Sequence, residues 1–361
     1  MKRNIIFLSL ISSLVFLPGC LLEDNLKQPY MGFSPFDIND GWEVSVPSAE
    51  NIDSLALDLV YKQLYADDDF WMTKSLLVFR NGKIVAESYL KTSQDRMKTD
   101  AVWSCTKQVN AIITGIAIHE GKIARIDDPI EKYLPDYIAR YPDKAGITIE
   151  NLLMMKGGID FDNGYQSDVF RMHKTDNSLD YVLGLGLRSE PGTDFWYNDG
   201  EPQLMSGIVQ AATGVPMDEY ARTVFFDKIG MTNYDWVRYS DGVTMGGFGI
   251  LTTPRELAKI ARCVLDSGRV GEVQVIPEEW VLEMTSAKTE VDDLHSFGYY
   301  WWSIPDKGYI HMWGHGGQYA FIIPEKKMLV VMTSLSQVDD DVNVPVGKVV
   351  DLVDRIAETA E

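Results

Sequence analysis

Cysteine and histidine are both scarce in this chain of 361 residues, which contains three cysteines and five histidines. The cysteines stand far apart, at Cys20, Cys105 and Cys263, so neither a paired-cysteine zinc pattern nor a dense disulfide framework can form. The sequence also lacks His-Glu-x-x-His and comparable ligand spacings. We therefore expect no metal and no cofactor.

Basic residues are also in short supply. The chain has 33 lysines and arginines against 53 acidic residues, which gives a formal net charge of −20. This excess opposes binding to nucleic acid and electrostatic attraction to anionic lipid. The length and the hydrophobic fraction of 45% suit a globular protein with one large domain or two moderate ones. We expect a small-molecule or peptide substrate as its partner.

Long apolar runs are limited to the N-terminus, where the run from Ile5 to Leu17 is too short to span a bilayer as a helix. Lys2 and Arg3 precede it, and Leu17-Pro18-Gly19-Cys20 follows. This arrangement resembles a bacterial lipoprotein signal, although an ordinary signal peptide is the alternative. The resemblance implies cleavage before Cys20 and lipidation of its sulfur, which would anchor the chain in the cell envelope, at the outer membrane, in the periplasm or on the extracellular face. We expect a signal peptide over residues 1–19, a tether over 20–48 and one domain over 49–361.

The stretch from Ser104 to Ile118 contains the first candidate for chemistry. The segment from Val109 to Ile118 is mostly apolar, which predicts a buried helix. Ser104 stands at its start, where serine is a favoured cap, and Lys107 shares a face with it. A serine hydroxyl becomes a nucleophile when a neighbouring base takes its proton, and the helix N-terminus suits a developing oxyanion. Because a serine three residues before a lysine is common by chance, this pattern is not sufficient alone.

The order of predicted elements indicates the fold class. A helix over residues 52–65 and a hairpin around Asn81-Gly82 open the chain. Short helices and loops fill residues 128–244, and apolar runs at 299–302, 309–312, 319–323 and 328–333 predict strands before a closing helix over 338–360. The chain therefore reads as α+β, with one antiparallel sheet built from both chain ends, flanked by helices, and an inserted helical subdomain at about 128–244.

Two later motifs support the catalytic interpretation of Ser104. Phe195-Trp196-Tyr197-Asn198-Asp199-Gly200 precedes a predicted helix, and His315-Gly316-Gly317-Gln318 precedes a predicted strand. Together with Ser104-Cys105-Thr106-Lys107 and in this order, they resemble the signature of the serine β-lactamase and penicillin-binding protein superfamily. The resemblance covers about residue 51 to the C-terminus, and its esterase and D-aminopeptidase-like branch is the most similar.

The resemblance implies a role for each matching residue. Ser104 matches the acylated nucleophile, Lys107 the general-base partner and Tyr197 the tyrosine that relays a proton to the leaving group. The backbone N–H groups of Ser104 and Gln318 would form the oxyanion hole. Asp199, His315, Gly316 and Gly317 match the positions that contact substrate.

Two positions depart from the family pattern. His315 stands where β-lactamases have a lysine that helps to bind the antibiotic's carboxylate, and imidazole is mostly uncharged at neutral pH, so β-lactam hydrolysis is in doubt. Asp199 replaces an asparagine, and an ionised carboxylate only accepts hydrogen bonds. It could raise the pKa of Lys107, which works against a base, or it could orient the lysine.

These observations favour a serine hydrolase that cleaves an ester or amide through an acyl-enzyme. The alternatives are a ligand-binding or sensor module of the same fold without turnover, and a penicillin-binding or β-lactamase activity. Structural interpretations stay open for single residues: Tyr197 and His315 could serve packing alone, and His119 is expected in the core. Trp301, Trp302 and Trp313 are expected in the core and the pocket wall. Cys105 is expected to be a buried thiol, although a disulfide with Cys263 is possible.

Overall fold

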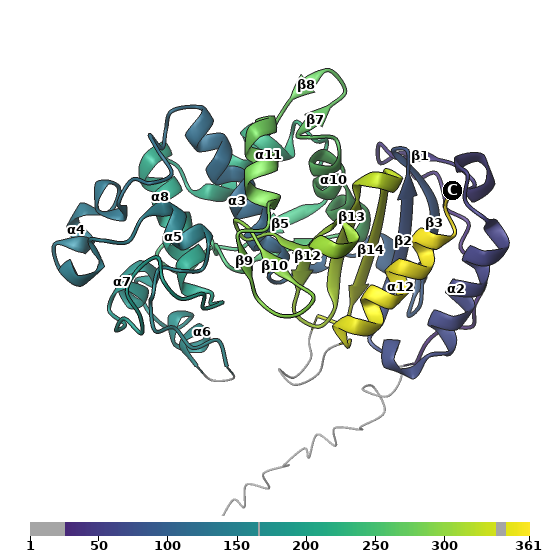
Figure 1. The fold of residues 1–361 in the computed structure, drawn as a ribbon, viewed down its shortest axis with the longest axis horizontal. Coiled ribbons are helices and arrows are strands. Elements are labelled where there is room, and N and C mark those ends of the chain that lie inside the picture. The colour runs from purple at the N-terminus through teal and green to yellow at the C-terminus, as the bar shows by residue number, and fades with distance from the viewer. Residues whose placement is uncertain (1–25, 165–166, 337–343) are drawn as a thin grey trace, which may run out of the picture.

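The computed structural model describes residues 26–164, 167–336 and 344–361, and a nine-stranded sheet runs through it (Figure 1). The strand order is β1-β3-β2-β14-β13-β12-β11-β10-β9, and every neighbouring pair is antiparallel except β1 with β3. Strands from both chain ends meet where β2 pairs with β14. This confirms the predicted α+β class. The strands are β1 Glu43–Val44, β2 Thr73–Arg80, β3 Lys83–Tyr89, β9 Thr289–Glu290, β10 Ser296–Phe297, β11 Trp302–Ile304, β12 Tyr309–Gly314, β13 Gln318–Ile323 and β14 Met328–Ser334.

Apolar side chains on both faces of the sheet create two hydrophobic cores. Successive residues of a strand point to opposite faces, and in β2 Leu77 and Phe79 belong to one core while Leu76 and Val78 belong to the other. Helices cover both faces, so the sheet is the middle layer (Figure 1). Helices α2 (Ser54–Ala66) and α12 (Val346–Glu358) cover one face, and α3 (Cys105–His119), α10 (Pro254–Leu265) and α11 (Glu278–Thr285) lie on the other.

The helical subdomain packs beside α3, which is shared by both parts of the molecule. Its longest helix, α8, contacts α3, α5 and α7. Thr148 caps α5 with a reciprocal capping box, in which its side chain and that of Asn151 each accept a backbone N–H of the other residue. The helices are α4 Pro135–Ile138, α5 Ile149–Leu153, α6 Asp168–Met172, α7 Ser178–Leu183, α8 Gly200–Thr213 and α9 Met217–Ala221. A small sheet of β4 (Asp100–Ala101), β6 (Ile250–Thr252) and β5 (Tyr234–Trp236) joins this region to the start of α3, and β7 (Arg269–Val270) pairs with β8 (Val273–Gln274).

The N-terminal segment lies against the sheet from residue 26 onward. Its Gln28 N–H donates to the carbonyl of Leu90 at 2.6 Å, and Phe33 accepts from the N–H of Glu87 at 2.8 Å. Strand β1 then extends the sheet edge beside β3. The described part of the predicted tether is therefore docked on the domain, because its backbone satisfies the free edge of β3. The expected signal peptide and Cys20 lie outside the described residues.

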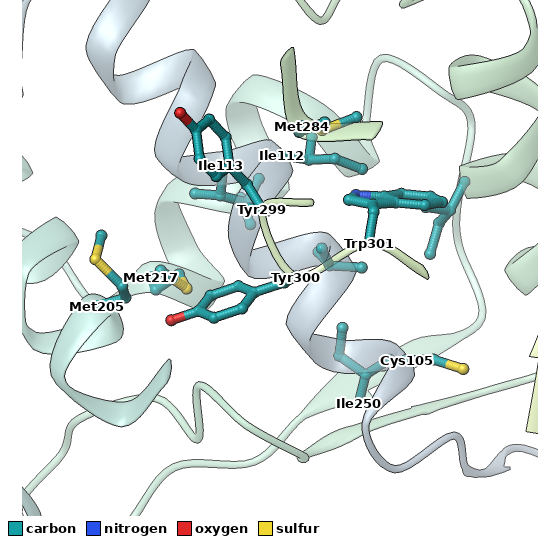
Figure 2. Packing of buried hydrophobic residues seen from close by; sticks show 14 of the residues in the cluster. Cys105, Ile112, Ile113, Met205, Met217, Ile250, Met284, Tyr299, Tyr300 and Trp301 are labelled. Atoms are coloured by element: carbon teal, nitrogen blue, oxygen red, sulfur yellow. The ribbon is translucent and has the colours of Figure 1, made fainter. Parts of the chain in front are cut away.

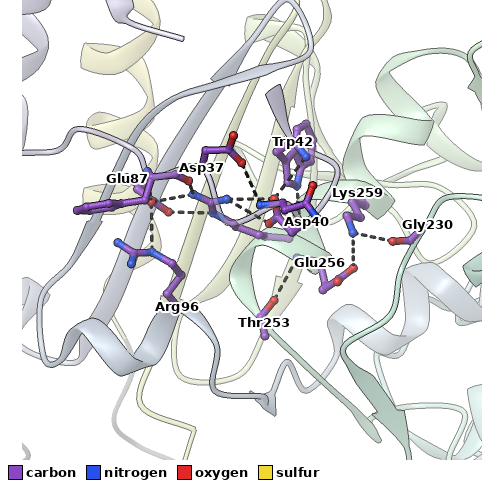
Figure 3. Close-up of polar contacts among 12 residues, drawn as sticks. Asp37, Asp40, Trp42, Glu87, Arg96, Gly230, Thr253, Glu256 and Lys259 are labelled. Atoms are coloured by element: carbon purple, nitrogen blue, oxygen red, sulfur yellow. Dashed lines mark hydrogen bonds and ion pairs between the residues drawn. The ribbon is translucent and has the colours of Figure 1, made fainter. Parts of the chain in front are cut away.

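A buried ion-pair cluster, here called the Arg255 cluster, fastens this segment to α10. Arg255 donates to both carboxylate oxygens of Glu87 at 2.8 and 3.0 Å, to Asp40 at 3.1 Å and to the carbonyl of Phe36 at 2.7 Å. Arg96 approaches Glu87 from the other side at 3.3 Å (Figure 3). All guanidinium nitrogens of Arg255 are thus occupied, which offsets the cost of burying its charge.

Several sequence-based expectations need correction. Residues 299–301 are not a strand: Tyr300 has φ +60, and Figure 2 shows that the segment lies across α3. There the carbonyl of Tyr300 accepts a hydrogen bond from the Gln108 amide. His119 is exposed at the end of α3 rather than in the core, since the helix leaves the protein interior there. The expectation that Cys105 is a buried thiol is confirmed, and Cys263 is also a buried free thiol, so the alternative of a disulfide between them does not hold.

Two boundaries also differ from the expectation. The closing helix begins at Val346, and residues 338–343 of its predicted range lie outside the described residues. Strand β13 begins one residue early, at Gln318, which leaves residues 315–317 as the turn after β12. Within the described ranges, no helix combines the length and apolar character needed to cross a membrane.

Candidate active site

The start of α3 is held in a constrained backbone conformation. Trp103 has φ +48, which is uncommon for a non-glycine residue, and its indole N–H is anchored at 3.0 Å on the carbonyl of Ser336. The end of β12 packs tightly against Val102, the residue before Trp103, because a Cβ on Gly314 would lie 2.2 Å from the carbonyl oxygen of Val102. Only glycine permits this approach. The β12–β13 hairpin is therefore brought directly beside Ser104.

Ser104 and Lys107 are joined as their spacing predicts. Ser104 precedes α3 but makes no capping bond; its Oγ instead accepts a hydrogen bond from Lys107 Nζ at 2.8 Å. Lys107 is fully buried, and Nζ also donates to the carbonyl of Gly247 at 2.9 Å and pairs with Asp199 Oδ1. An ammonium has three N–H donors. Every donor of Lys107 therefore has an acceptor, as a lysine cation requires.

The ion pair between Lys107 and Asp199 shows how the carboxylate affects the pKa and the position of the lysine. Burial by itself would lower the pKa of Lys107, but the Asp199 carboxylate and then Tyr197 outweigh it, so the pKa lies above its ordinary value. Asp199 thus both orients the lysine and holds it in its charged form. Asp199 is held in turn at the N-terminus of α8, where its backbone N–H donates to Asn163 Oδ1 at 2.9 Å.

Tyr197 completes the polar group around Ser104. Its side chain interacts with both Ser104 and Lys107, and Lys107 Nζ lies 4.9 Å from the centre of its ring. Burial raises the pKa of Tyr197, and the nearby Lys107 cation only partly offsets this effect. Tyr197 therefore rests as a neutral phenol that can donate a proton. The structure brings all three predicted catalytic side chains together.

The turn between β12 and β13 forms the opposite wall. His315, Gly316 and Gly317 make this turn, and both glycines have positive φ, of 75° and 99°. Gln318 opens β13 opposite Gly314, and its carbonyl lies 3.6 Å from Cys105 Sγ. The side chain of Gln318 is turned away and bonds to Ser334. The backbone of Gln318 thus lies beside the start of α3, as the predicted oxyanion hole requires.

The backbone N–H of Ser104 is the second group expected in that hole. Among the described residues it has no hydrogen-bond partner, unlike the N–H groups of the next three residues. It lies at the N-terminus of α3, where the helix dipole favours negative charge. An oxyanion would therefore find one free donor there.

A cavity of about 740 Å³ opens in front of Ser104. The described part of its wall is mostly aromatic and aliphatic, with Asp199 as the charged member. Trp302 and Trp313 line it and Trp301 is fully buried, so the expectation for these tryptophans is met. The lining residues are Trp103, Ser104, Asn163, Gly164, Val169, Tyr197, Asp199, Phe248, Trp302, Trp313, Gly314, His315, Tyr319, Val344, Pro345 and Val346.

Three site residues were missed by sequence reasoning. Gly247 supplies an acceptor for Lys107 and approaches Asp199 so closely that a Cβ would lie 2.8 Å from Oδ1. The run Gly246-Gly247-Phe248-Gly249 was a usable signal for such a close approach. Asn163 and Phe248 carry no comparable signal, because their contacts join segments far apart in the chain.

Glu201 is an unusual buried carboxyl next to this group. It is fully buried near the start of α8, where Oε2 accepts the N–H of Gly157 at 3.1 Å and Oε1 has no partner in the described part of the chain. Burial raises the pKa of Glu201 to about 8, against hydrogen bonds from Gly157 and its neighbours that lower it. The side chain is therefore mostly protonated at neutral pH. No cluster of potential metal ligands occurs in the ranges that the structure describes.

Comparisons with known proteins agree with this geometry. The sequence model of the β-lactamase family matches residues 74–345. A 6-aminohexanoate-dimer hydrolase of Paenarthrobacter ureafaciens is 24% identical over 289 residues, which cover 73% of this chain and 72% of that protein. The family match includes each segment that supplies the polar group around Ser104.

Solved structures show the same fold. A penicillin-binding protein from Bacillus halodurans superposes with a TM-score of 0.63 at 18% identity, covering 81% of this chain and 99% of that one. A class C β-lactamase gives a TM-score of 0.66 at 15% identity, covering 87% and 97%. Since the family match spans well over half of the sequence and the fold agrees, the chain belongs to the β-lactamase family, within the superfamily of serine β-lactamases and penicillin-binding proteins.

Proposed function

We propose that this protein is a serine hydrolase that cleaves an ester or amide through an acyl-enzyme. The observation that carries the proposal is the direct hydrogen bond between Ser104 and the buried Lys107, at the mouth of a cavity. Ser104 Oγ bonds to the substrate carbonyl carbon while the bond to the leaving alcohol or amine breaks. Water then releases the acid and restores the serine hydroxyl.

The protonation states of Lys107 and Tyr197 determine how Ser104 is activated. At rest Lys107 is an ammonium and Tyr197 a neutral phenol, so neither is ready to act as a base. The active form is therefore the one in which the group of Lys107, Asp199 and Tyr197 has lost one proton. Lys107 then accepts the proton of Ser104, and Tyr197 donates its own to the leaving group and recovers one through Lys107. Activity is expected to rise with pH.

The tetrahedral intermediate needs stabilisation of its oxyanion. We assign this role to the backbone N–H groups of Ser104 and Gln318. The N–H of Ser104, which has no partner among the described residues and lies at a helix N-terminus, and the position of Gln318 beside Cys105 support the assignment. His315, Gly316 and Gly317 form the neighbouring turn that a substrate would contact.

A panel of chromogenic esters tests the proposal. Wild-type protein should hydrolyse at least one 4-nitrophenyl ester with saturation kinetics, and Ser104→Ala should not. Hydrolysis by Ser104→Ala at the wild-type rate would remove Ser104 from the mechanism. A folded wild type without any turnover would favour the alternative, a binding or sensor module. Its support is the raised pKa of Lys107, which disfavours the base form.

Anchoring in the cell envelope through Cys20 is a separate proposal. Its support is the sequence alone, namely the apolar run before Leu17-Pro18-Gly19-Cys20. Expression in a bacterium with an alkyne-bearing fatty acid should label the wild type and leave Cys20→Ser unlabelled. Equal labelling of both proteins would exclude lipidation at this cysteine.

A further inference from the structure

The nucleophile lies between two groups of aromatic rings. On one side Trp103 packs against Phe248, with ring centres 6.3 Å apart, and meets His315 edge-on at 5.8 Å. Trp103 is directly before Ser104, and its anchored indole cannot turn away without losing the bond to Ser336. A rigid apolar surface therefore starts one residue from the attacking oxygen.

The second aromatic group is larger and continuous. Tyr197 lies 5.7 Å from Trp302, Trp302 lies 5.0 Å from Trp313, and Trp313 stacks on Tyr319 at 5.8 Å. All four rings line the cavity, and Val344, Pro345 and Val346 extend the same apolar wall. Flat or branched apolar groups gain most from such a surface, because rings pack favourably edge-on or offset.

The charges of the cavity oppose an anionic substrate. Asp199 is the one lining residue with a carboxylate, and neither lysine nor arginine occurs among the lining side chains of the described chain. Lys107 lies behind the wall with all three donors used. A substrate carboxylate would therefore lose its hydration without gaining a cation, and Asp199 would repel it.

We propose that the site selects substrates with an aromatic acyl group and rejects acyl groups that carry a carboxylate. This inference rests on the proposed serine hydrolase function and adds its substrate class. The reaction is the one described above: Ser104 Oγ takes the aromatic acyl group, the alcohol leaves with a proton, and water releases the aromatic acid.

A set of shape-matched 4-nitrophenyl esters tests this selection. The acyl groups are 4-methylbenzoyl, 4-carboxybenzoyl, 4-(aminomethyl)benzoyl and acetyl, and each kcat/KM is divided by the rate of hydroxide-catalysed hydrolysis of the same ester. We expect the 4-methylbenzoyl ester to exceed the 4-carboxybenzoyl and acetyl esters at least tenfold, and the cationic ester to exceed the 4-carboxybenzoyl ester. A 4-carboxybenzoyl ester that equals or exceeds either of the other aromatic esters would overturn the proposal, as would a preference for acetyl.

Two variants connect the selection to the cavity wall. Trp313→Ala should reduce the ratio of 4-methylbenzoyl to acetyl turnover at least tenfold, whereas Trp71→Ala, on the half-exposed surface elsewhere, should leave it unchanged. His315→Lys supplies a cation in the turn and should raise the relative rate on the 4-carboxybenzoyl ester at least fivefold. This second variant keeps the test valid if Trp313→Ala does not fold. Unchanged ratios in both would contradict the inference.

Failure of this inference is distinguishable from failure of the proposed function. If no ester is hydrolysed and Ser104 cannot be labelled, the hydrolase assignment itself is wrong. If esters are hydrolysed through Ser104 but the anionic one is preferred, only the substrate class is wrong.

Discussion

Two of the buried clusters of charge in the described chain can be compared, and of these two the Lys107–Asp199 pair has the means for chemistry. In the Arg255 cluster and in the Lys107–Asp199 pair, the cationic side chain is almost completely buried, at 2% and 0% exposure. Arg255 donates its hydrogen bonds to two carboxylates and a carbonyl. Lys107 instead gives one of its three hydrogen bonds to the hydroxyl of Ser104, which borders a cavity.

This difference shows what turns a buried ion pair into a candidate active site. A pair whose donors are all taken by carboxylates and a carbonyl holds segments together, as Arg255 does for the N-terminal segment and α10. A pair that includes a hydroxyl facing a cavity can exchange a proton with a substrate. Perturbed pKa values occur in both kinds of cluster, so geometry rather than charge alone distinguishes them.

The largest expected effect is on the chemistry of the site. Ser104→Ala should lower kcat/KM for an ester substrate by a factor of about 10⁴ or more, because the covalent route is lost. Its free energy of unfolding should stay close to wild type. Steady-state kinetics and urea denaturation measure the two quantities, with Ser93→Ala, at an exposed position, as the control. A wild-type kcat/KM in Ser104→Ala would show that the Lys107–Asp199 pair does not serve catalysis through Ser104.

The converse effect is expected in the Arg255 cluster. Arg255→Ala leaves Glu87 and Asp40 without their main partner, so the free energy of unfolding should fall by about 3–5 kcal/mol. Under conditions where the variant stays folded, kcat should be close to wild type. Arg269→Ala, whose side chain is 45% exposed, is the matched control for urea denaturation. A loss of kcat without a loss of stability would make this cluster catalytic.

The buried carboxyl group of Glu201 is expected to make the free energy of unfolding depend on pH. Its pKa is raised from 4.5 to about 8 in the folded protein, so its contribution to stability is complete below about pH 4.5 and is lost as the pH rises through 8. The loss should be of the order of a few kcal/mol. Urea denaturation at about pH 5 and pH 9 should show a smaller loss in Glu201→Gln than in wild type. The exposed Glu325→Gln should behave like wild type, and an identical loss in all three proteins would show that Glu201 does not titrate in this range.

The packing of β12 against the start of α3 predicts a smaller, local effect. Gly314→Ala places a methyl group where only 2.2 Å separates its carbon from the carbonyl oxygen of Val102, so the backbone beside Ser104 must shift. A displacement of this size should reduce kcat by about 10²-fold. Gly186→Ala, which has no atom within 4 Å of the new carbon, should leave kcat unchanged. Equal kcat values for both variants would show that the approach of β12 has no catalytic role.

Asp199→Asn tests the pair itself by removing its negative charge. Without that charge the pKa of Lys107 should fall, so the ascending limb of kcat/KM against pH should move to lower pH. Asp194→Asn, at an exposed position close in sequence, should leave the limb in place. An unmoved limb in Asp199→Asn would show that another group controls activation.

Local patterns predicted much of this architecture. The Asn81-Gly82 turn, with both residues at positive φ, joins β2 and β3 as expected for a two-residue hairpin loop. The helix after Ser104 follows from its apolar run, and the Ser104–Lys107 contact follows from their spacing on one helical turn. These features depend on residues that are neighbours in the sequence.

Long-range contacts account for what local patterns do not predict, and the effect of Asp199 on Lys107 was anticipated only through the family resemblance. Asp199 meets Lys107 across 92 positions, and Gly247 meets it across 140, so neither bond is visible in a local pattern. The segment at 299–301 has strand-like residues, yet tertiary packing on α3 decides its conformation. Docking of the N-terminal segment likewise depends on Arg255, more than 200 residues away.

Labelling with a fluorophosphonate tests the central claim that Ser104 is an activated nucleophile. Intact-protein mass spectrometry would be recorded on wild type and on folded Ser104→Ala after the same treatment. We predict one adduct on wild type, located by peptide mapping to Ser104, and none on the variant. An unlabelled, correctly folded wild type, or an equal adduct on the variant, would contradict the claim.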